Sequence, residues 1–482
     1  MLFSIDDRLT LIPFSLFLGT ITLGGIFCSS SLVHFISLSR RRGLCVCVIY
    51  IKEFYEEKLG KNWSLLDTKP LEYSLYIFSL FLSLSLSLVM FSAVHDRMKK
   101  FFHDDEAEAQ KIVKVFVVVS VGFLFVSFKI NPIQFGKNLI KKTRVYALAV
   151  SHLVLSNEKK GLKALQKEMD FDEETIKSQS KLKGTRTIYF LRHGESQWNY
   201  VFNRGFGVSF PLRLARGVVM ELMCLFNARN SFFVDAPLSD RGLEQVEELR
   251  KFLNKVNDPF LTDAEVAALR SKHVDVLRAD AAKGEKLSKK SIIVTSNLRR
   301  AAHTAAIAFM DRFERTKEKL FVNNALQEMA RNVDAFALAG EAFDAVPYTG
   351  ITNVAKDKGT LNTIVEETVK FDVESNAGNK GIGRRGATDC LRFAHWATSP
   401  SAVPKECEAI IATGHSIYFK EFFKLFLPSA SKHDAKSKKI VNCGVIAFEL
   451  KKYEHEKKGV FYSIDENSIE TVYGGFVQKG KH

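Results

Sequence analysis

The pattern of apolar and polar positions divides the chain into an apolar N-terminal part and a globular C-terminal part. Residues 11–33, 73–94 and 112–130 form three apolar runs, each close to the ~20 residues that cross a bilayer. From residue 185 onward, short β-branched runs alternate with amphipathic segments of helix length. This βαβ rhythm predicts an α/β fold: a three-layer α/β/α sandwich with a mostly parallel central sheet, preceded by N-terminal transmembrane helices.

Three regions follow from this pattern. Residues 1–130 are interpreted as a membrane-anchor region, 131–184 as an amphipathic helix and linker, and 185–482 as a catalytic domain. Strands are predicted at 187–191, 291–295, 320–322, 409–413, 442–450, 461–464 and 470–473, and helices at 239–253, 299–313, 388–397 and 416–427. Two long insertions, 198–236 and 329–386, interrupt the pattern. Loops of this length in a compact domain are usually functional or disordered, so we expect the second to be a lid or specificity insertion.

Each apolar run has a competing interpretation. The first contains Pro13 and three glycines, which weaken a helix, and a signal peptide is its alternative. The second contains a Ser-Leu repeat of low complexity, so the working protein can instead begin at Met90 or Met98. The third can instead be a buried core strand or helix. All three nevertheless have the length of membrane spans.

Basic residues suggest an orientation in the membrane. A group of them follows the third run: Lys137, Lys141, Lys142 and Arg144. By the positive-inside rule, the catalytic domain faces the cytosol, although basic residues before the run weaken this assignment. Asn131-Pro132 predicts the start of a helix that ends near Leu155. Two interpretations of this helix stay open: it lies on lipid headgroups, or it packs on the catalytic domain.

Composition narrows the possible partners. The formal net charge of +15 favours acidic partners, either a phosphorylated substrate or an anionic membrane. Nucleic acid is not expected, because no nucleic-acid motif occurs. The seven cysteines form no C-x-x-C pair and no zinc-ligand spacing, which indicates reduced thiols and no metal site. No cofactor is expected.

Candidate chemistry gathers where predicted strands end. The strand at 187–191 is followed directly by Arg192-His193-Gly194, and Gly194 permits a sharp turn. Later predicted strands lead to Arg300, Glu328 and His415. The carboxyl ends of parallel strands meet at one edge of a sheet, where ligands bind.

These residue types suit phosphoryl transfer. Arg192 and Arg300 supply always-charged, forked donors for phosphate oxygens, and a protonated His415 adds a third donor. His193 must be neutral at one ring nitrogen to attack phosphorus, and the neighbouring cations disfavour its protonation. Glu328 has the chemistry of an acid that protonates the leaving oxygen and then activates water as a base.

The motifs resemble those of a known family. Arg192-His193-Gly194-Glu195-Ser196 resembles the signature of the histidine phosphatase superfamily, which includes phosphoglycerate mutases. The blocks with Arg300, Glu328 and His415 are similar to later blocks of that family and follow in the same order. The resemblance covers about 300 residues, from 185 to the end. It implies that Arg300, rather than Arg299, grips phosphate, and that Asn199 touches it.

The resemblance implies phosphomonoester hydrolysis through phosphohistidine, without metal or cofactor, here by a membrane-anchored enzyme. Phosphoglycerate mutase-type transfer is an alternative, but residues 329–332 do not resemble the mutase segments. A catalytically weak, membrane-anchored interaction module is a second alternative. His303 and His395 lie in predicted helices and are expected to be structural. Arg204, Arg213 and Arg216 have the chemistry to meet lipid headgroups.

Overall fold

The structure is a computed structural model. It describes residues 132–156, 158, 162–168, 180–224, 227, 229–255, 272–280, 290–349, 364–381, 386–456 and 459–477. The chain divides into two units, Met1–Pro70 and Leu71–His482, and every described residue belongs to the second. The three predicted membrane spans, at 11–33, 73–94 and 112–130, lie outside the described residues. Within the described part, no helix combines the length and apolarity needed to cross a bilayer.

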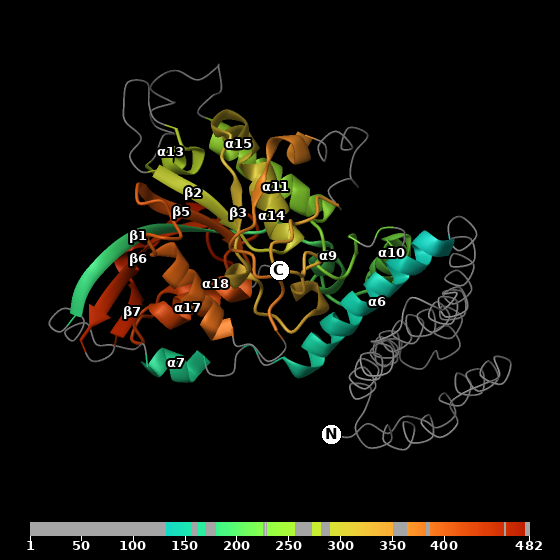
Figure 1. The fold of residues 1–482 in the computed structure, drawn as a ribbon, viewed down its shortest axis with the longest axis horizontal. Helices are drawn as coiled ribbons and strands as arrows, with labels where there is room; N and C mark the ends of the chain where they lie inside the picture. Colours follow the sequence, from blue (N-terminus) through green and yellow to red (C-terminus); the bar gives the residue numbers. More distant parts are fainter. Residues whose placement is uncertain are drawn as a thin grey trace, which may run out of the picture. The chain divides into compact units, whose positions relative to one another are not determined.

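One mixed sheet organises the described part of the chain, in the order β4-β3-β2-β5-β1-β6-β7, with β8 also paired to β6. The strands from β4 to β1 are parallel, and β6, β7 and β8 are antiparallel. The mostly parallel α/β architecture predicted from the sequence is confirmed (Figure 1). The strands are β1 (Ser180–Arg192), β2 (Lys290–Thr295), β3 (Leu320–Val322), β4 (Phe371–Asp372), β5 (Cys407–Gly414), β6 (Val445–His455), β7 (Gly459–Ile464) and β8 (Glu470–Tyr473).

Helices cover both faces of this sheet because side chains alternate along its strands. Ile188 and Phe190 of β1 enter one core, whereas Tyr189 and Leu191 enter the other. Burying a ring such as Phe190 contributes about 2–3 kcal/mol. The first core is covered by α7 (Leu162–Glu168), α17 (Gly386–Ala397) and α18 (Ser416–Phe426). The second is covered by α11 (Asp240–Asn254), α13 (Lys272–Arg278), α14 (Arg299–Ala308) and α15 (Met310–Thr316). Figure 1 shows the two groups on opposite sides of the sheet.

The first strand begins earlier than the predicted boundary at residue 185. β1 starts at Ser180, and its first residues pair with the distal half of β6, with Ser180 opposite His455. Residues 180–184 are mostly polar and carry no strand-like alternation. Their extended conformation comes from pairing with a strand more than 260 positions later, which local sequence does not reveal. Residues 180–184 are therefore strand rather than linker.

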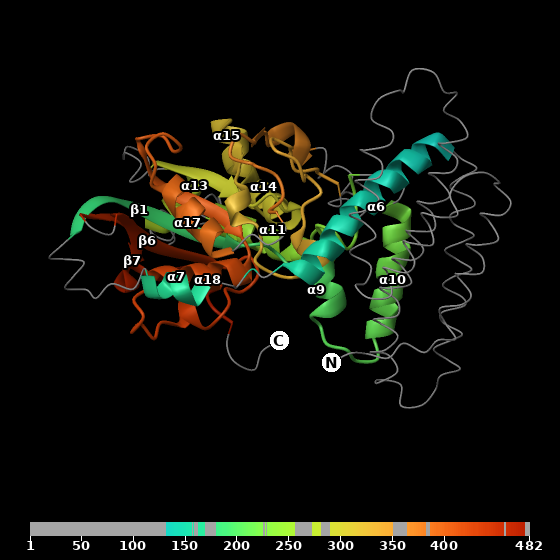
Figure 2. The same cartoon turned by 60° about the horizontal axis from the view of Figure 1, so that its bottom comes forward.

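The 198–236 insertion contains two helices, α9 (Gln197–Phe202) and α10 (Phe210–Met223). It packs beside α6 (Pro132–Leu155), the first described helix, as both views show (Figures 1 and 2). The buried Lys142 of α6 pairs with Glu221 of α10 at 3.0 Å. Glu221 also accepts hydrogen bonds from the backbone N–H groups of Phe232 and Phe233.

Helix α6 is packed on the rest of the unit, in line with one of its two interpretations. Leu139 and Ala149 are buried. Ala149 contacts a cluster formed with Val234, Val333 and Phe336. α6 also contacts the short 3₁₀ turn η4 (Val333–Ala335), close to Glu328. Further 3₁₀ turns among the described residues are η3 (Asn324–Leu326), η5 (Asp434–Lys436) and η6 (Glu466–Ser468).

Candidate active site

The predicted site residues lie where the parallel strands end. Arg192 is opposite Gly414 in the β1–β5 register, and Thr295 is opposite Thr413 in the β2–β5 register. These pairings bring the residues that follow β1, β2 and β5 to one edge of the sheet. The backbone N–H of His193 donates to the Gly414 carbonyl at 3.1 Å, which fixes the exit of β1.

A close crossing of two backbones explains the turn after His193. A Cβ on Gly194 would lie 2.7 Å from the carbonyl oxygen of Gly242, at the start of α11. A Cβ on Gly242 would lie 2.0 Å from the carbonyl oxygen of Glu195. Only glycine fits at either position without displacing the backbone. Glu195 itself is structural, because its carboxylate accepts from Arg204 and Ser239.

His193 is held in the tautomer that nucleophilic attack needs. Its Nδ1 lies 2.6 Å from the Gly194 carbonyl oxygen, which only accepts, so Nδ1 carries the proton and Nε2 keeps its lone pair. Burial, and then the charges of Arg300 and Arg192, hold the pKa of His193 well below its usual value. The ring is therefore neutral at pH 7, as the sequence predicted.

Three buried nitrogen atoms around His193 have no partner among the described residues: Nε of Arg192, Nε of Arg300 and Nδ1 of His415. The centroids of the His193 and His415 rings lie 5.0 Å apart. Burial lowers the pKa of Arg192 to about 10, which leaves it charged at neutral pH. Buried polar atoms are nearly always hydrogen-bonded, so three such orphans in one place indicate a site for an acceptor-rich ligand.

The charge state of His415 follows from its buried position beside Arg300. Burial and the charge of Arg300 hold its pKa well below the usual value, so it is neutral in the free protein. Its Nε2 lies 3.0 Å from Oγ of Ser296, which already accepts from the Leu298 N–H. If the Ser296 hydroxyl donates to Nε2, Nδ1 carries the proton. His415 then points an uncharged donor at the ligand.

Glu328 follows η3 and is buried. Its Oε1 accepts from the backbone N–H of Met329 at 2.9 Å and of Tyr418 at 3.2 Å. The charge of Glu328 acts on both Arg192 and Asp334, which places the carboxyl in the same group. The backbone therefore holds Oε1, whereas Oε2 takes part in neither of these two hydrogen bonds.

Sequence reasoning missed Asp334. This buried residue of η4 places Oδ2 3.5 Å from Nη1 of Arg300, and its carbonyl accepts from the same atom at 2.8 Å. Burial raises its pKa to about 6, although Arg300 opposes the shift. No local signal marked it, because it lies in an insertion without clear periodicity.

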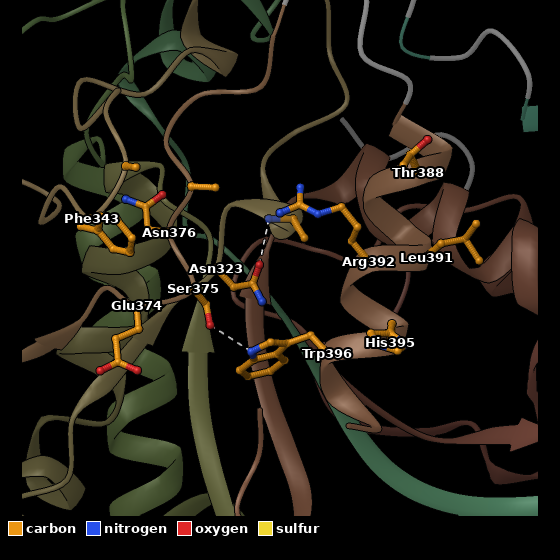
Figure 3. Close-up of a pocket in the computed structure, with 13 residues that line it drawn as sticks. Asn323, Phe343, Glu374, Ser375, Asn376, Thr388, Leu391, Arg392, His395 and Trp396 are labelled. Atoms are coloured by element: carbon orange, nitrogen blue, oxygen red, sulfur yellow. Dashed lines mark hydrogen bonds between the residues drawn. The ribbon is translucent and has the colours of Figure 1, made fainter. Parts of the chain in front are cut away.

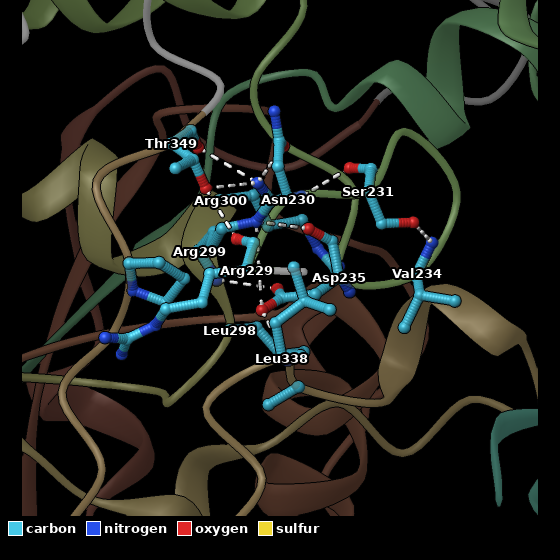
Figure 4. Close-up of polar contacts among 12 residues, drawn as sticks. Arg229, Asn230, Ser231, Val234, Asp235, Leu298, Arg299, Arg300, Leu338 and Thr349 are labelled. Carbon is cyan, nitrogen blue, oxygen red and sulfur yellow. Dashed lines mark hydrogen bonds and ion pairs between the residues drawn. The ribbon is translucent and has the colours of Figure 1, made fainter. Parts of the chain in front are cut away.

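Arg299, next to Arg300, is bonded throughout its guanidinium (Figure 4). Its Nε donates to the Asp235 carbonyl at 2.9 Å, Nη1 to Asn230 and Thr349, and Nη2 to the Ser231 carbonyl at 2.5 Å. These contacts, here called the Arg299 cluster, tie the 198–236 insertion to α14. Of the two arginines, Arg300 is the one with a buried, unpartnered nitrogen. This agrees with the expectation that Arg300, rather than Arg299, binds phosphate.

Several other predicted residues occupy different settings. Asn199 accepts from Asn203 at 2.7 Å, and among the described contacts none joins it to His193, Arg300 or His415. Arg213 is buried and donates to the carbonyls of Val201 and Gly205, so it does not face solvent.

The 329–386 insertion is bonded to the turn that precedes Glu328. Asn324 Nδ2 donates to the Gly378 carbonyl at 2.8 Å, and Gln327 Nε2 donates to Asn379 Oδ1 at 2.8 Å. The insertion also forms one wall of a cavity of about 570 Å³, and α17 forms the opposite wall (Figure 3). Trp396 joins the two walls by donating to Ser375 at 3.0 Å. None of the five predicted catalytic residues is among those that line this cavity.

The remaining polar groups suggest structural roles. His303 is buried and contacts the Pro347 carbonyl at 3.0 Å, and His395 lies 3.4 Å from the Tyr462 hydroxyl. Over the described ranges, His, Cys, Asp and Glu side chains nowhere gather in threes with the geometry for a metal ion.

Comparison with known proteins gives similar solved structures only. No family model matches the sequence, and no curated protein matches it. A mycobacterial glucosyl-3-phosphoglycerate phosphatase, solved with VO3, is 13% identical, with a TM-score of 0.26, over 58% of this chain and 97% of that one. The ecdysone phosphate phosphatase of Bombix mori, solved with tungstate, is 13% identical, with a TM-score of 0.27, over 62% and 95%.

A third structure, a protein called mycobacterial hydrolase 1, is 14% identical, with a TM-score of 0.26, over 61% of this chain and all of the other. Members of the histidine phosphatase superfamily, which the sequence motifs resemble, are thus among the similar structures.

Proposed function

We propose that this protein hydrolyses phosphomonoesters through a phosphohistidine formed on His193. One observation carries the proposal: the unpartnered nitrogens of Arg192, Arg300 and His415 surround a neutral histidine whose Nε2 keeps its lone pair. A phosphoryl group supplies the oxygen acceptors that these nitrogens lack.

Two balanced steps follow. In the first, Nε2 of His193 attacks phosphorus, the bond to the ester oxygen breaks, and that oxygen takes a proton from Glu328. In the second, the Glu328 carboxylate takes a proton from water as the water oxygen attacks phosphorus. The P–N bond then breaks, which releases inorganic phosphate and restores His193. Arg192, Arg300 and His415 stabilise the charge on the phosphoryl oxygens in both steps.

The test is rapid-quench trapping with the purified full-length chain. A phosphorylated peptide containing His193 is expected during turnover of p-nitrophenyl phosphate, and His193→Ala is expected to form none. A panel of sugar phosphates, phosphoproteins and phospholipids then identifies the substrate class. If no ester is hydrolysed across about pH 5 to 8, the proposal fails and an interaction module is favoured. Isomerisation of phosphoglycerate favours a mutase instead.

We further propose that the chain is membrane-anchored, with this unit on the cytosolic side. The predicted spans support the anchor, and two helices of the described part support contact with an anionic surface. Val208, Leu212 and Met223, in or next to α10, are exposed, with Leu212 at 75%. α6 carries no acidic residue, and it exposes Lys137 and Lys141. Apolar and basic positions together suit a bilayer with anionic lipid.

Alkaline carbonate extraction of cell membranes checks this part of the proposal. The full-length chain is expected to stay with the membranes. Recovery in the soluble fraction would contradict the anchor and would leave the proposed hydrolysis untouched, because the two claims rest on different residues.

A further inference from the structure

A buried lysine joins the segment after α6 to the backbone of Glu328. Lys380 Nζ lies 2.8 Å from Oε1 of Glu158, and it also donates to the carbonyl oxygen of Glu328. Lys380 and Glu158 are each 2% exposed. Glu158 follows α6, whereas Lys380 belongs to the 329–386 insertion. Three segments that are distant in the sequence therefore meet at the proposed acid.

A buried ion pair is weak evidence of stabilisation, because desolvation offsets most of the attraction between its charges. Lys380 of this pair does, however, donate a hydrogen bond to the backbone carbonyl of Glu328. The other end is also held, since Oε1 of the carboxylate accepts from the N–H groups of Met329 and Tyr418. Glu328 is thus fixed at both its carbonyl and its carboxylate.

The α6 segment also contacts the residue two positions after Glu328. His152 Nε2 lies 3.2 Å from the Ala330 carbonyl, so Nε2 carries the proton. Burial, and then the charge of Lys380, lower the pKa of His152 to about 4, so it is neutral at pH 7. It lies 3.7 Å from Glu158 but carries no charge there, which leaves Lys380 as the cation paired with Glu158. The Glu158 carbonyl accepts from the Gly386 N–H at 3.1 Å.

We infer that Lys380 and Glu158 are positioning residues for proton transfer by Glu328, and that the segment carrying α6 is a functional part of the active site. The inference rests on the proposed hydrolysis, in which Glu328 protonates the leaving oxygen. A general acid must lie within hydrogen-bond reach of that oxygen. Lys380 holds the backbone from which the Glu328 side chain reaches it.

Leaving-group dependence tests this role in the full-length chain. p-Nitrophenolate leaves without protonation, whereas an alkoxide such as that of glycerol 2-phosphate needs the acid. The measurement is the single-turnover rate of phosphohistidine formation, which excludes the later water step. Lys380→Met is expected to slow formation from glycerol 2-phosphate by about 10- to 100-fold, the usual effect of misplacing a catalytic group by about 1 Å. Formation from p-nitrophenyl phosphate is expected to change by less than about threefold, since this ester does not need the acid.

Two further variants separate positioning from stability. Lys142→Met breaks a different buried ion pair, which joins α6 to Glu221 of α10. It is expected to lower the Tm without changing the ratio of the two rates. The double variant Glu158→Gln/Lys380→Met leaves no unpaired buried charge. Its Tm is expected to return toward the native value while the loss on glycerol 2-phosphate persists.

Failure of the positioning role and failure of the proposed hydrolysis give different results. Equal losses on both esters, or no loss on either, would overturn the positioning role while native hydrolysis stands. A native chain that forms no His193-dependent phosphoenzyme from either ester would refute the proposed function, and the role in catalysis with it.

Discussion

Arg299 and Arg300 are consecutive residues at the start of α14, and both are buried, yet their surroundings differ. In the Arg299 cluster, every guanidinium nitrogen donates to a neighbouring oxygen. Arg300 keeps an unpartnered Nε, and its charge acts on His193 and His415. A satisfied arginine stabilises a loop, whereas an unsatisfied one retains hydrogen-bonding capacity for a ligand. The pattern of hydrogen bonds thus distinguishes two arginines that burial and charge alone do not.

The largest expected effect is at His193. His193→Ala removes the nucleophile, so phosphatase activity is expected to fall by on the order of 10⁴-fold or more. The Tm is expected to stay close to the native value, because the main-chain bonds that fix this position remain. Steady-state kinetics and thermal unfolding check both claims. Activity within tenfold of native would remove His193 from the chemistry.

Replacing each of the two arginines by methionine tests the comparison directly. Arg300→Met is expected to lower kcat/KM by about 10²–10³-fold, as the loss of one transition-state donor does. Its loss of stability is expected to be smaller than that of Arg299→Met, because the Asp334 carboxyl that it leaves has a pKa already raised to about 6 and is readily neutralised. Arg299→Met is expected to destabilise the chain by about 3–5 kcal/mol, because it leaves Asp235 buried without its cation. Kinetics and chemical denaturation distinguish the two. The comparison fails if the effects are interchanged.

The pH dependence of stability tests the structural role of His303, a buried histidine of α14. Burial, and then the charge of Arg299, lower the pKa of His303 to about 3 in the folded protein, against ~6.5 when unfolded. Between these values the unfolded chain binds a proton that the folded chain does not. Stability is therefore lost as pH falls from 6.5 toward 3, by about 1.4 kcal/mol per pH unit.

His303→Gln is expected to remove this component, so that its free energy of unfolding falls less steeply with acid than that of the native chain. Glutamine retains an N–H for the Pro347 carbonyl, which limits other changes. Parallel slopes in chemical denaturation between about pH 4 and 6 would show that His303 is charged in the fold.

The smallest expected effect concerns Asp334. Above its pKa of about 6 this carboxylate is charged beside Arg300, where it is expected to compete with a bound phosphoryl group. Asp334→Asn is expected to lower KM for p-nitrophenyl phosphate about three- to tenfold at pH 7.5. The advantage is expected to vanish below pH 6, where native Asp334 is neutral. The ratio of KM values across this range is the measurement, and a constant ratio would exclude the competition.

The sequence by itself determined the α/β architecture and the strand ends at which chemistry is predicted. Leu320–Val322 was predicted at the bounds it has in the structure, and β2 and β5 were placed to within two residues. These elements follow from local periodicity, and a strand's end fixes which residue reaches the sheet edge. The predicted membrane spans stay predictions, as do the catalytic roles of the five residues.

Only the tertiary structure decided how buried polar groups are partnered. The first five residues of β1, the pairing of Asp334 with Arg300, and the Glu158–Lys380 pair all depend on partners far away in the sequence. The same holds for the two arginines of α14. Their positions differ by one residue, but the bonding of Arg299 depends on oxygens from residues 230–235 and 349. Periodicity predicts which face of a helix or strand is buried. It does not predict which distant oxygen accepts a hydrogen bond from a given buried donor.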